Sequence, residues 1–354
     1  MNPELILLPE WYAQEAVILA WPDEKTDWKP WLKDVRNTYK QLIEAITHNN
    51  TGVILLIREQ EVDAAKLLLK DCRKLMLVIT HYNDTWCRDY CFLTVKQESS
   101  MQPIEFIFNG WGNKFDANLD NKVNTAVLTN LCKQPLKSVD LVAEGGALEI
   151  DQYGHLLSTA MCLQNPQRNG SMTNATYQAM FREHLGASQI SILENGHLEG
   201  DDTDGHIDTL VRFTEHSGVV IQSCFNRPED SHFNGLNALV NEVKARLPEH
   251  DIFELPLPYI LNEVGERLPA SYANFLISNQ QVLCPIYRQP EDQLALEIIA
   301  NAYPGYQIVA IDSLPLVQQF GSVHCISMQV PKGTLKAEVL DNLRDGLTVY
   351  GYEA

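Results

Sequence analysis

The sequence predicts a mixed α/β fold in which five similar units form a ring. Short β-type runs alternate with amphipathic helical runs, and this alternation recurs about every sixty to seventy residues. A late β-type run, residues 323–331, is left over and can pair with the first unit. Closing the last strand on the first would remove exposed sheet edges, which favours a ring over an open sheet. The pattern alone leaves open an α/β protein whose regularity is only apparent.

Three units in the second half of the chain show the repeat most clearly. Each has a predicted β-hairpin, then a helix, then a further strand. A turn at Gly154 joins the two strands of the first hairpin. The hairpins, helices and strands are expected at residues 147–159, 173–185 and 189–193, at 206–224, 233–247 and 251–258, and at 271–287, 293–303 and 306–312.

Two looser units precede these three. The sequence predicts β-type runs at 89–97 and 105–111, a helix at 121–132 and a strand at 138–142, and before them a strand at 16–22, a helix at 33–46 and a strand at 53–57. The late run at 323–331 is expected to pair with this first unit. No linker rich in Gly, Pro or Ser divides the chain, so residues 1–354 are expected to form one domain.

The composition is that of an ordinary globular protein, with 45% hydrophobic and 21% charged residues. A formal charge of −19 argues against nucleic acid and anionic membranes as partners and favours a cationic small molecule. No apolar run reaches the roughly 18 residues that span a bilayer, and no signal-peptide pattern is present. We therefore expect a cytoplasmic protein, which could also form a homo-oligomer.

The sequence does not indicate a metal site. Its eight cysteines form no CxxC pair and no tight cluster with histidine, so most are expected to be buried reduced thiols. The acidic segment GDDTDGHID, residues 200–208, could be a calcium loop. Counted from Asp202, however, its glycine comes at the fourth position, and Phe213 stands where an EF-hand has glutamate.

Reactive residues stand where the predicted units open. Equivalent positions of a ring face one end of its axis. The segments at these positions, given below, would therefore bring together a thiol, an imidazole and three carboxylates. On a strand, His206 and Asp208 would project from the same face. The segments are residues 86–89, 144–146 and 204–208, together with residues 324–325 in the closing strand.

Each of these residues also has a structural interpretation. Cys325 alone could be a buried apolar thiol, Asp89 an ion-pair partner of Arg88, and Glu144 a turn residue before two glycines. A guanidinium ligand would explain them together. Carboxylates bind this planar cation through paired hydrogen bonds, and cysteine with histidine supplies the nucleophile and proton shuttle that its hydrolysis needs.

Four motifs carry a resemblance to a known family. NDTWCRDY (83–90), EGGALEID (144–151), DDTDGHID (201–208) and VHCISMQ (323–329) resemble the agmatine deiminase and bacterial-type peptidylarginine deiminase family. The similarity covers nearly the whole chain, including FNGWGNKFDANLDN (108–121) and NPQRN (165–169). These enzymes belong to the guanidino-group modifying superfamily, so the resemblance implies a five-bladed α/β-propeller.

The resemblance also implies roles for individual residues. Cys325 would be the nucleophile, His206 the general acid and base, Asp89 and Asp208 the guanidinium clamps, and Glu144 a support for the histidine. Trp86, Trp111 and Asp202 are expected to contact substrate, and neither a metal nor an organic cofactor is expected. Two local departures concern loop geometry: Tyr90-Cys91-Phe92 stands where the family has a glycine and often a proline, and the glycine-rich run before the nucleophile is reduced to Gly321.

The implied reaction is hydrolysis of agmatine to N-carbamoylputrescine and ammonia through an amidino-cysteine, as in putrescine and polyamine metabolism. The net charge and the acidic FDANLDN segment favour agmatine, whereas Lys114 could serve the carboxylate of free or peptide-terminal arginine. An amidinotransferase or dimethylarginine hydrolase would use the same thiol and imidazole. A non-catalytic guanidine- or polyamine-binding propeller is the alternative outside enzymes.

Overall fold

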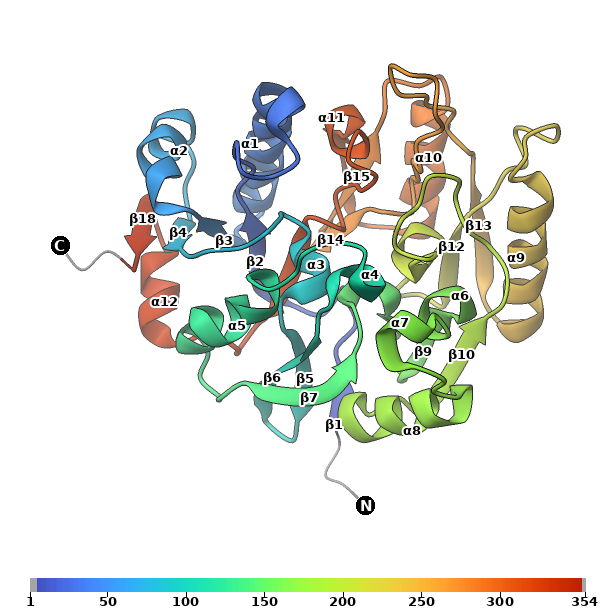
Figure 1. The fold of residues 1–354 in the computed structure, drawn as a ribbon, viewed down its shortest axis with the longest axis horizontal. Helices are drawn as coiled ribbons and strands as arrows, with labels where there is room; N and C mark the ends of the chain where they lie inside the picture. Colours follow the sequence, from blue (N-terminus) through green and yellow to red (C-terminus); the bar gives the residue numbers. More distant parts are fainter. Residues whose placement is uncertain (1–4, 352–354) are drawn as a thin grey trace.

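The computed structural model describes residues 5–351 and has a mixed α/β fold (Figure 1). The strands of this part of the chain form five separate sheets. All five share one plan, in which a central strand pairs antiparallel with one neighbour and parallel with the other. The central strands are β2 (Gln14–Ala20), β6 (Ser100–Ile107), β9 (His155–Thr159), β12 (Gly218–Gln222) and β15 (Gln281–Ile286).

The hairpin, helix and strand predicted for each of the three later units are confirmed. They are β8 (Glu149–Ile150), β9, α8 (Asn174–Leu185) and β10 (Gln189–Leu193); β11 (Val211–Phe213), β12, α9 (Phe233–Arg246) and β13 (Asp251–Leu255); and β14 (Leu276–Ser278), β15, α10 (Asp292–Ala302) and β16 (Gln307–Asp312). Local chemistry sets the bounds of α8: the Thr173 hydroxyl accepts from the Thr176 amide at its start, and Gly186 ends it in the left-handed conformation.

The sheet that joins the two ends of the chain has the strand order β17-β2-β3-β4-β18. Strand β17 (Ser327–Pro331) pairs antiparallel with β2, which confirms the predicted pairing of the late run with the first unit. Beyond β3 (Gly52–Ile57) it contains two strands that were not predicted, β4 (Leu75–Ile79) and β18 (Leu347–Tyr350). The remaining sheet has the order β1-β5-β6-β7, with β1 (Leu5–Leu7), β5 (Leu93–Gln97) and β7 (Lys137–Val142).

The longer helices lie at the outside of the fold in Figure 1, and the short helices α3 (Cys87–Tyr90) and α4 (Gly110–Asn113) lie near its centre. Helix α1 (Leu32–His48) buries one face through Val35, Tyr39, Leu42, Ile43 and Ile46, which recur at helical spacing. The other helices are α2 (Val62–Leu68), α5 (Val123–Ala126), α6 (Ala160–Leu163), α7 (Pro166–Asn169), α11 (Leu314–Val317) and α12 (Ala337–Asn342).

The predicted helix at 121–132 is wrong as one element. It breaks into the 3-10 turn Asp120–Lys122, helix α5 and the 3-10 turn Leu128–Leu131, with Val127 outside helical geometry. β-Branched residues and asparagine favour helix weakly, and the Asn124 side chain bonds the backbone of Tyr90 and Phe92 instead. Within residues 5–351, no helix is long and apolar enough to cross a membrane.

Candidate active site

Short helical turns, rather than strands, carry the predicted site residues. Asp89 lies on α3 before β5, and Glu144 directly precedes the 3-10 turn Gly145–Ala147 before β8. The 3-10 turn Ile207–Thr209 before β11 holds Asp208, with His206 at its start, so the predicted strand geometry for this pair is wrong. Cys325 lies in a turn just before β17 and not in the closing strand itself.

The predicted groups nevertheless lie close together around the thiol. Cys325 Sγ is 3.9 Å from Asp208 Oδ2. His206 Nδ1 is 3.6 Å from Asp89 Oδ1, and His206 Nε2 is 3.9 Å from Glu144 Oε2. All five side chains are buried. The turns of four units therefore bring a thiol, an imidazole and three carboxylates into one cluster, as the sequence predicts.

Asn274 is the contribution of the remaining unit, and sequence reasoning missed it. It lies just before β14, and its Oδ1 is 3.4 Å from Cys325 Sγ and 3.3 Å from the Cys325 amide nitrogen. The repeat itself was the available signal, because Asn274 stands where the hairpin of its unit opens. An isolated amide indicates no particular chemistry, so no local motif identifies Asn274.

A glycine makes the close approach of these groups possible. A Cβ added to Gly146 would lie 2.7 Å from His206 Nδ1, 2.8 Å from Asp89 Oδ1 and 3.1 Å from Asp208 Oδ2. The Gly146 amide also donates to Asp89 Oδ1 at 2.9 Å. The second glycine of the EGG motif therefore packs its bare Cα against the imidazole and both aspartates.

Trp111 contacts Asp89 from a left-handed turn. Residues 110–113 all have positive φ, and a side chain at Gly110 would collide with the Phe115 carbonyl. This backbone conformation costs about 1–2 kcal/mol for each non-glycine residue. It directs Trp111 Nε1 to Asp89 Oδ2 at 2.8 Å, which explains the glycines of the NGWGN segment.

Asp208 is hydrogen-bonded to a second buried histidine, His324. His324 Nδ1 lies 2.6 Å from Asp208 Oδ2, and His324 Nε2 lies 2.6 Å from Glu10 Oε2. Arg212 Nη2 donates to the same Glu10 oxygen at 2.9 Å. Sequence reasoning did not identify Glu10 or Arg212 as part of the site, because these contacts join segments far apart in the chain.

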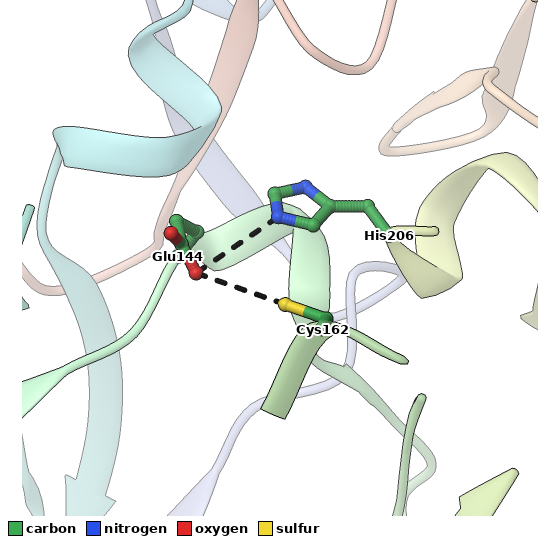
Figure 2. A group of neighbouring side chains, drawn as sticks. All are labelled: Glu144, Cys162 and His206. Atoms are coloured by element: carbon green, nitrogen blue, oxygen red, sulfur yellow. Dashed lines mark hydrogen bonds and ion pairs between the residues drawn. The ribbon is translucent and has the colours of Figure 1, made fainter. Parts of the chain in front are cut away.

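Glu144 is held by a buried cation. Arg168 Nε lies 2.8 Å from Glu144 Oε1 and 3.0 Å from Oε2, and Arg168 Nη1 lies 2.7 Å from Asp204 Oδ2. Figure 2 shows dashed lines from Glu144 to both His206 and Cys162. The possible ligand atoms of these three residues all lie within 4.8 Å of one another. Although these residue types can bind metals, Arg168 already neutralises the carboxylate, and we assign no metal to this group.

Burial and neighbouring charges set the protonation of the site. Burial raises the pKa of Cys325 well above its usual value, and Asp208 and Asp89 add to the effect. Burial lowers the pKa of His206 to about 3. Burial, then Asp208 and Glu144, raise the pKa of Asp89. Without a bound cation, these shifts favour a neutral thiol, a neutral imidazole and the protonated form of Asp89.

A pocket of about 220 Å³ adjoins the cluster. Cys325, Asp89 and Asp208 line it, whereas His206 and Glu144 do not, and all three predicted substrate contacts, Trp86, Trp111 and Asp202, line it as well. Trp86 packs on Trp28 and fits only because residue 321 is glycine, since a Cβ there would lie 2.2 Å from the indole. Eight aspartates line the pocket with one basic residue, Lys25: Asp27, Asp84, Asp89, Asp116, Asp120, Asp201, Asp202 and Asp208.

Both sequence and structure comparisons define the class of this protein. The Porphyromonas-type peptidyl-arginine deiminase family matches residues 6–331. The chain therefore belongs to the agmatine deiminase and peptidyl-arginine deiminase family, whose members hydrolyse guanidino groups. The resemblance seen in the four sequence motifs is thereby confirmed.

Individual relatives extend along almost the whole chain. A Vibrio parahaemolyticus protein named "Putative agmatine deiminase" is 32% identical, with 89% of this chain and 93% of that protein covered. The C. jejuni agmatine deiminase, solved as a cysteine-to-serine variant with substrate bound, has a TM-score of 0.86 at 32% identity and covers 94% of this chain and 97% of its own. A Porphyromonas gingivalis structure named "Putative Arginine Deiminase" has a TM-score of 0.86 at 35% identity, with 94% of this chain and 100% of that chain covered.

Proposed function

We propose that this protein hydrolyses agmatine to N-carbamoylputrescine and ammonia. One observation carries the proposal: a cysteine thiol stands among buried polar atoms without hydrogen-bond partners, at the floor of an acidic pocket. Among the described residues, these atoms include Asp208 Oδ1, Asn274 Nδ2 and His206 Nε2. Unpaired buried polar groups are unfavourable, so a ligand that bonds them is expected.

In the proposed first half-reaction, the guanidinium ion binds between Asp89 and Asp208. The cation favours ionisation of both Asp89 and the Cys325 thiol, whose proton passes to His206. The thiolate attacks the guanidinium carbon and gives a neutral tetrahedral adduct. His206 then returns the proton to one NH2 group, and the carbon–nitrogen bond breaks to release ammonia and leave an amidino-cysteine.

The second half-reaction consumes water. His206 takes a proton from the water as its oxygen bonds to the amidino carbon, and the carbon–sulfur bond then breaks with the electron pair returning to sulfur. The product loses its remaining acidic proton to give the neutral ureido group, and His206 reprotonates the thiolate. Overall, guanidinium and water give the ureido product and ammonium. Glu144 supports the imidazolium form of His206. The lowered pKa of His206 disfavours this form when no cation is bound.

The pocket supports agmatine over arginine. Agmatine ends in an amine, whereas arginine brings a carboxylate that the acidic lining of the pocket disfavours. The one basic residue considered for that carboxylate, Lys114, bonds Asp204 Oδ1 at 2.8 Å and the Asp202 carbonyl at 2.6 Å. We assign the amine end to the acidic outer part of the pocket, with Asp202 as its contact and Trp86 and Trp111 as walls.

An ammonia-release assay across agmatine, free arginine and a peptide ending in arginine tests the substrate. We expect release from agmatine at a kcat/KM at least about a hundredfold higher than from either arginine form. Preference for arginine would support the alternative raised by the Porphyromonas gingivalis relative. Agmatine-dependent protection of Cys325 from alkylation without any turnover would support a non-catalytic binding protein.

We also propose the finer architecture on which this site depends. The shared strand plan of the five sheets and the β17–β2 pairing support five blades of an α/β-propeller in one domain. The small cationic substrate and its ureido product suit a cytoplasmic enzyme.

A further inference from the structure

His324 is the immediate neighbour of the nucleophile, yet its ring does not line the substrate pocket. The side chain is 2% exposed and lies between two carboxylates, with Nδ1 2.6 Å from Asp208 Oδ2 and Nε2 2.6 Å from Glu10 Oε2. Together with Glu10, Arg88 and Glu149, it lines a separate small cavity of about 30 Å³. Any effect of this ring on substrate must therefore pass through Asp208.

The hydrogen bonds determine which form of His324 fits. Both ring nitrogens face ionisable carboxylate oxygens, and only an imidazolium offers two N–H donors. The surrounding charges lead to the same form: Glu10, Glu149 and Asp208 are acids, whereas Arg88 and Arg212 supply two cations. Arg212 bonds Glu10 and Glu149, and Arg88 Nη2 is 3.8 Å from Glu10 Oε2. A protonated His324 supplies the third positive charge that balances this buried group.

We propose that His324 is a positioning residue: held as an imidazolium by Glu10, it keeps Asp208 ionised and turns its free oxygen toward the guanidinium ion. This inference rests on the proposed function. His324 occupies Asp208 Oδ2, and Oδ1 is the oxygen that has no partner among the described residues. Contacts thus run from Arg212 to Glu10, His324 and Asp208, and they connect the buried charges to the carboxylate that binds the substrate.

The charges around Asp208 agree with this assignment. Burial acts to raise the pKa of Asp208, but the hydrogen bond and the charge of His324 outweigh it, aided by Arg212, and the pKa lies below its usual value. The Cys325 thiol and Asp89 also face the site, and each would oppose ionisation of Asp208 only in its own ionised form. His324 is therefore the main group that keeps Asp208 charged before substrate binds.

A second buried histidine–carboxylate pair provides a matched control. His232 Nδ1 is 2.7 Å from Asp230 Oδ1, but its Nε2 accepts a hydrogen bond from the Glu199 amide at 2.8 Å. A nitrogen that accepts carries no proton, so His232 is neutral. The same His→Asn substitution can thus be made at a charged and at an uncharged buried histidine that each bond a carboxylate.

The test compares His324→Asn, His324→Gln and Glu10→Gln with His232→Asn. Asparagine can retain a bond to Asp208, and glutamine one to Glu10, but neither carries charge. In the Cys325→Ser protein, calorimetry should show His324→Asn weakening agmatine binding by about tenfold or more at pH 7. When His324→Asn is made in the protein that keeps Cys325, the acidic limb of the pH profile of kcat/KM should move to higher pH by about one unit or more. Asp208 would then hold its proton to higher pH.

Glu10→Gln should move the same limb in the same direction by less, and His232→Asn should leave it unchanged. A purely structural role would lower kcat/KM equally at every pH and would overturn the proposal. ¹⁵N spectra of histidine-labelled wild-type protein give a reading without any variant: a neutral His324 ring at pH 7 would also overturn it. If wild-type protein binds agmatine without releasing ammonia, the proposed function fails, while the binding and ¹⁵N results still decide the role of His324.

Discussion

Asp89 and Asp208 flank the same thiol, yet their surroundings differ. Asp89 receives hydrogen bonds from two uncharged donors, the Trp111 indole and the Gly146 amide. Asp208 receives one from His324, which bonds in turn to Glu10 beside Arg212. Both aspartates are buried, but the pKa of Asp89 lies above its usual value and that of Asp208 below it.

At Asp89, two uncharged donors do not offset burial and the charges of Asp208 and Glu144, whereas at Asp208 the His324 cation outweighs burial. The ionised form is therefore favoured at Asp208 and disfavoured at Asp89 when no cation is bound. A guanidinium ion can pair with Asp208 directly and displace the proton of Asp89. This arrangement avoids two adjacent buried negative charges when no substrate is present.

The largest expected effect removes the thiol and leaves both aspartates in place. Cys325→Ser should lower ammonia release from agmatine by at least about 10⁴-fold, because serine is a far weaker nucleophile, while agmatine still binds. Ammonia release and calorimetric binding measure the two effects. Cys224→Ser is the control, since that buried thiol donates to the Arg227 carbonyl, as serine can. Turnover retained in Cys325→Ser would remove this residue as the nucleophile.

The same amide substitution should affect stability differently at the two aspartates. Asp208→Asn leaves the His324 cation with only one of its two carboxylates, Glu10, and should lower the free energy of unfolding by about 3–5 kcal/mol at pH 7. Asp89→Asn removes a carboxyl group whose raised pKa opposes folding above its unfolded pKa, so it should not lower the free energy of unfolding at pH 7 and should increase it. Denaturant unfolding at pH 7 measures both, and equal losses would contradict the comparison.

The pH dependence of these differences has opposite signs. Because the folded-state pKa of Asp208 is lowered, its stabilisation is present above the unfolded pKa and is lost as pH falls through the folded value, so the penalty of Asp208→Asn should shrink in acid. The pKa of Asp89 is raised, so its stabilisation is lost as pH rises above the unfolded pKa toward the folded one. Asp89→Asn should thus become more stable relative to wild type with rising pH.

A smaller effect is expected from the uncharged support of Asp89. Trp111→Phe keeps an aromatic wall but removes the Nε1 donor, and it should reduce kcat/KM for agmatine about tenfold by weakening a hydrogen bond to a carboxylate. Trp28→Phe is the control, because its indole nitrogen bonds the Thr85 hydroxyl instead. Equal losses in the two variants would indicate general packing rather than support of Asp89.

The smallest signal is a proton count. Agmatine binding to the Cys325→Ser protein should release about one proton at pH 7, because the cation displaces the proton of Asp89. Calorimetry in buffers with different ionisation enthalpies measures this number. The release should disappear in Asp89→Asn and persist in Trp111→Phe, and a buffer-independent enthalpy for the parent protein would contradict the assignment.

The sequence predicted the elements whose information is local. Hydrophobic periodicity located the hairpins, helices and third strands of the later units, and acidic or thiol-bearing motifs located five reactive residues. It did not predict the turn at His206 and Asp208, where Asp201 bonds Thr203 and Gly205 and so shapes the loop before the strand. The Glu10–His324 contact spans 314 positions in the chain and depends on β17 reaching β2, which no local pattern specifies.

The seam between β17 and β2 has a consequence for the order of synthesis. During translation the carboxylates, Asn274 and the imidazole emerge before Cys325, so a nascent chain can fold most of its sheets without the reactive thiol. The sheet that contains β2 and β3 must then keep one edge of β2 unpaired until β17 has been synthesised. Chemistry therefore begins only after the two ends of the fold have joined, and Glu10 meets His324 at the same step.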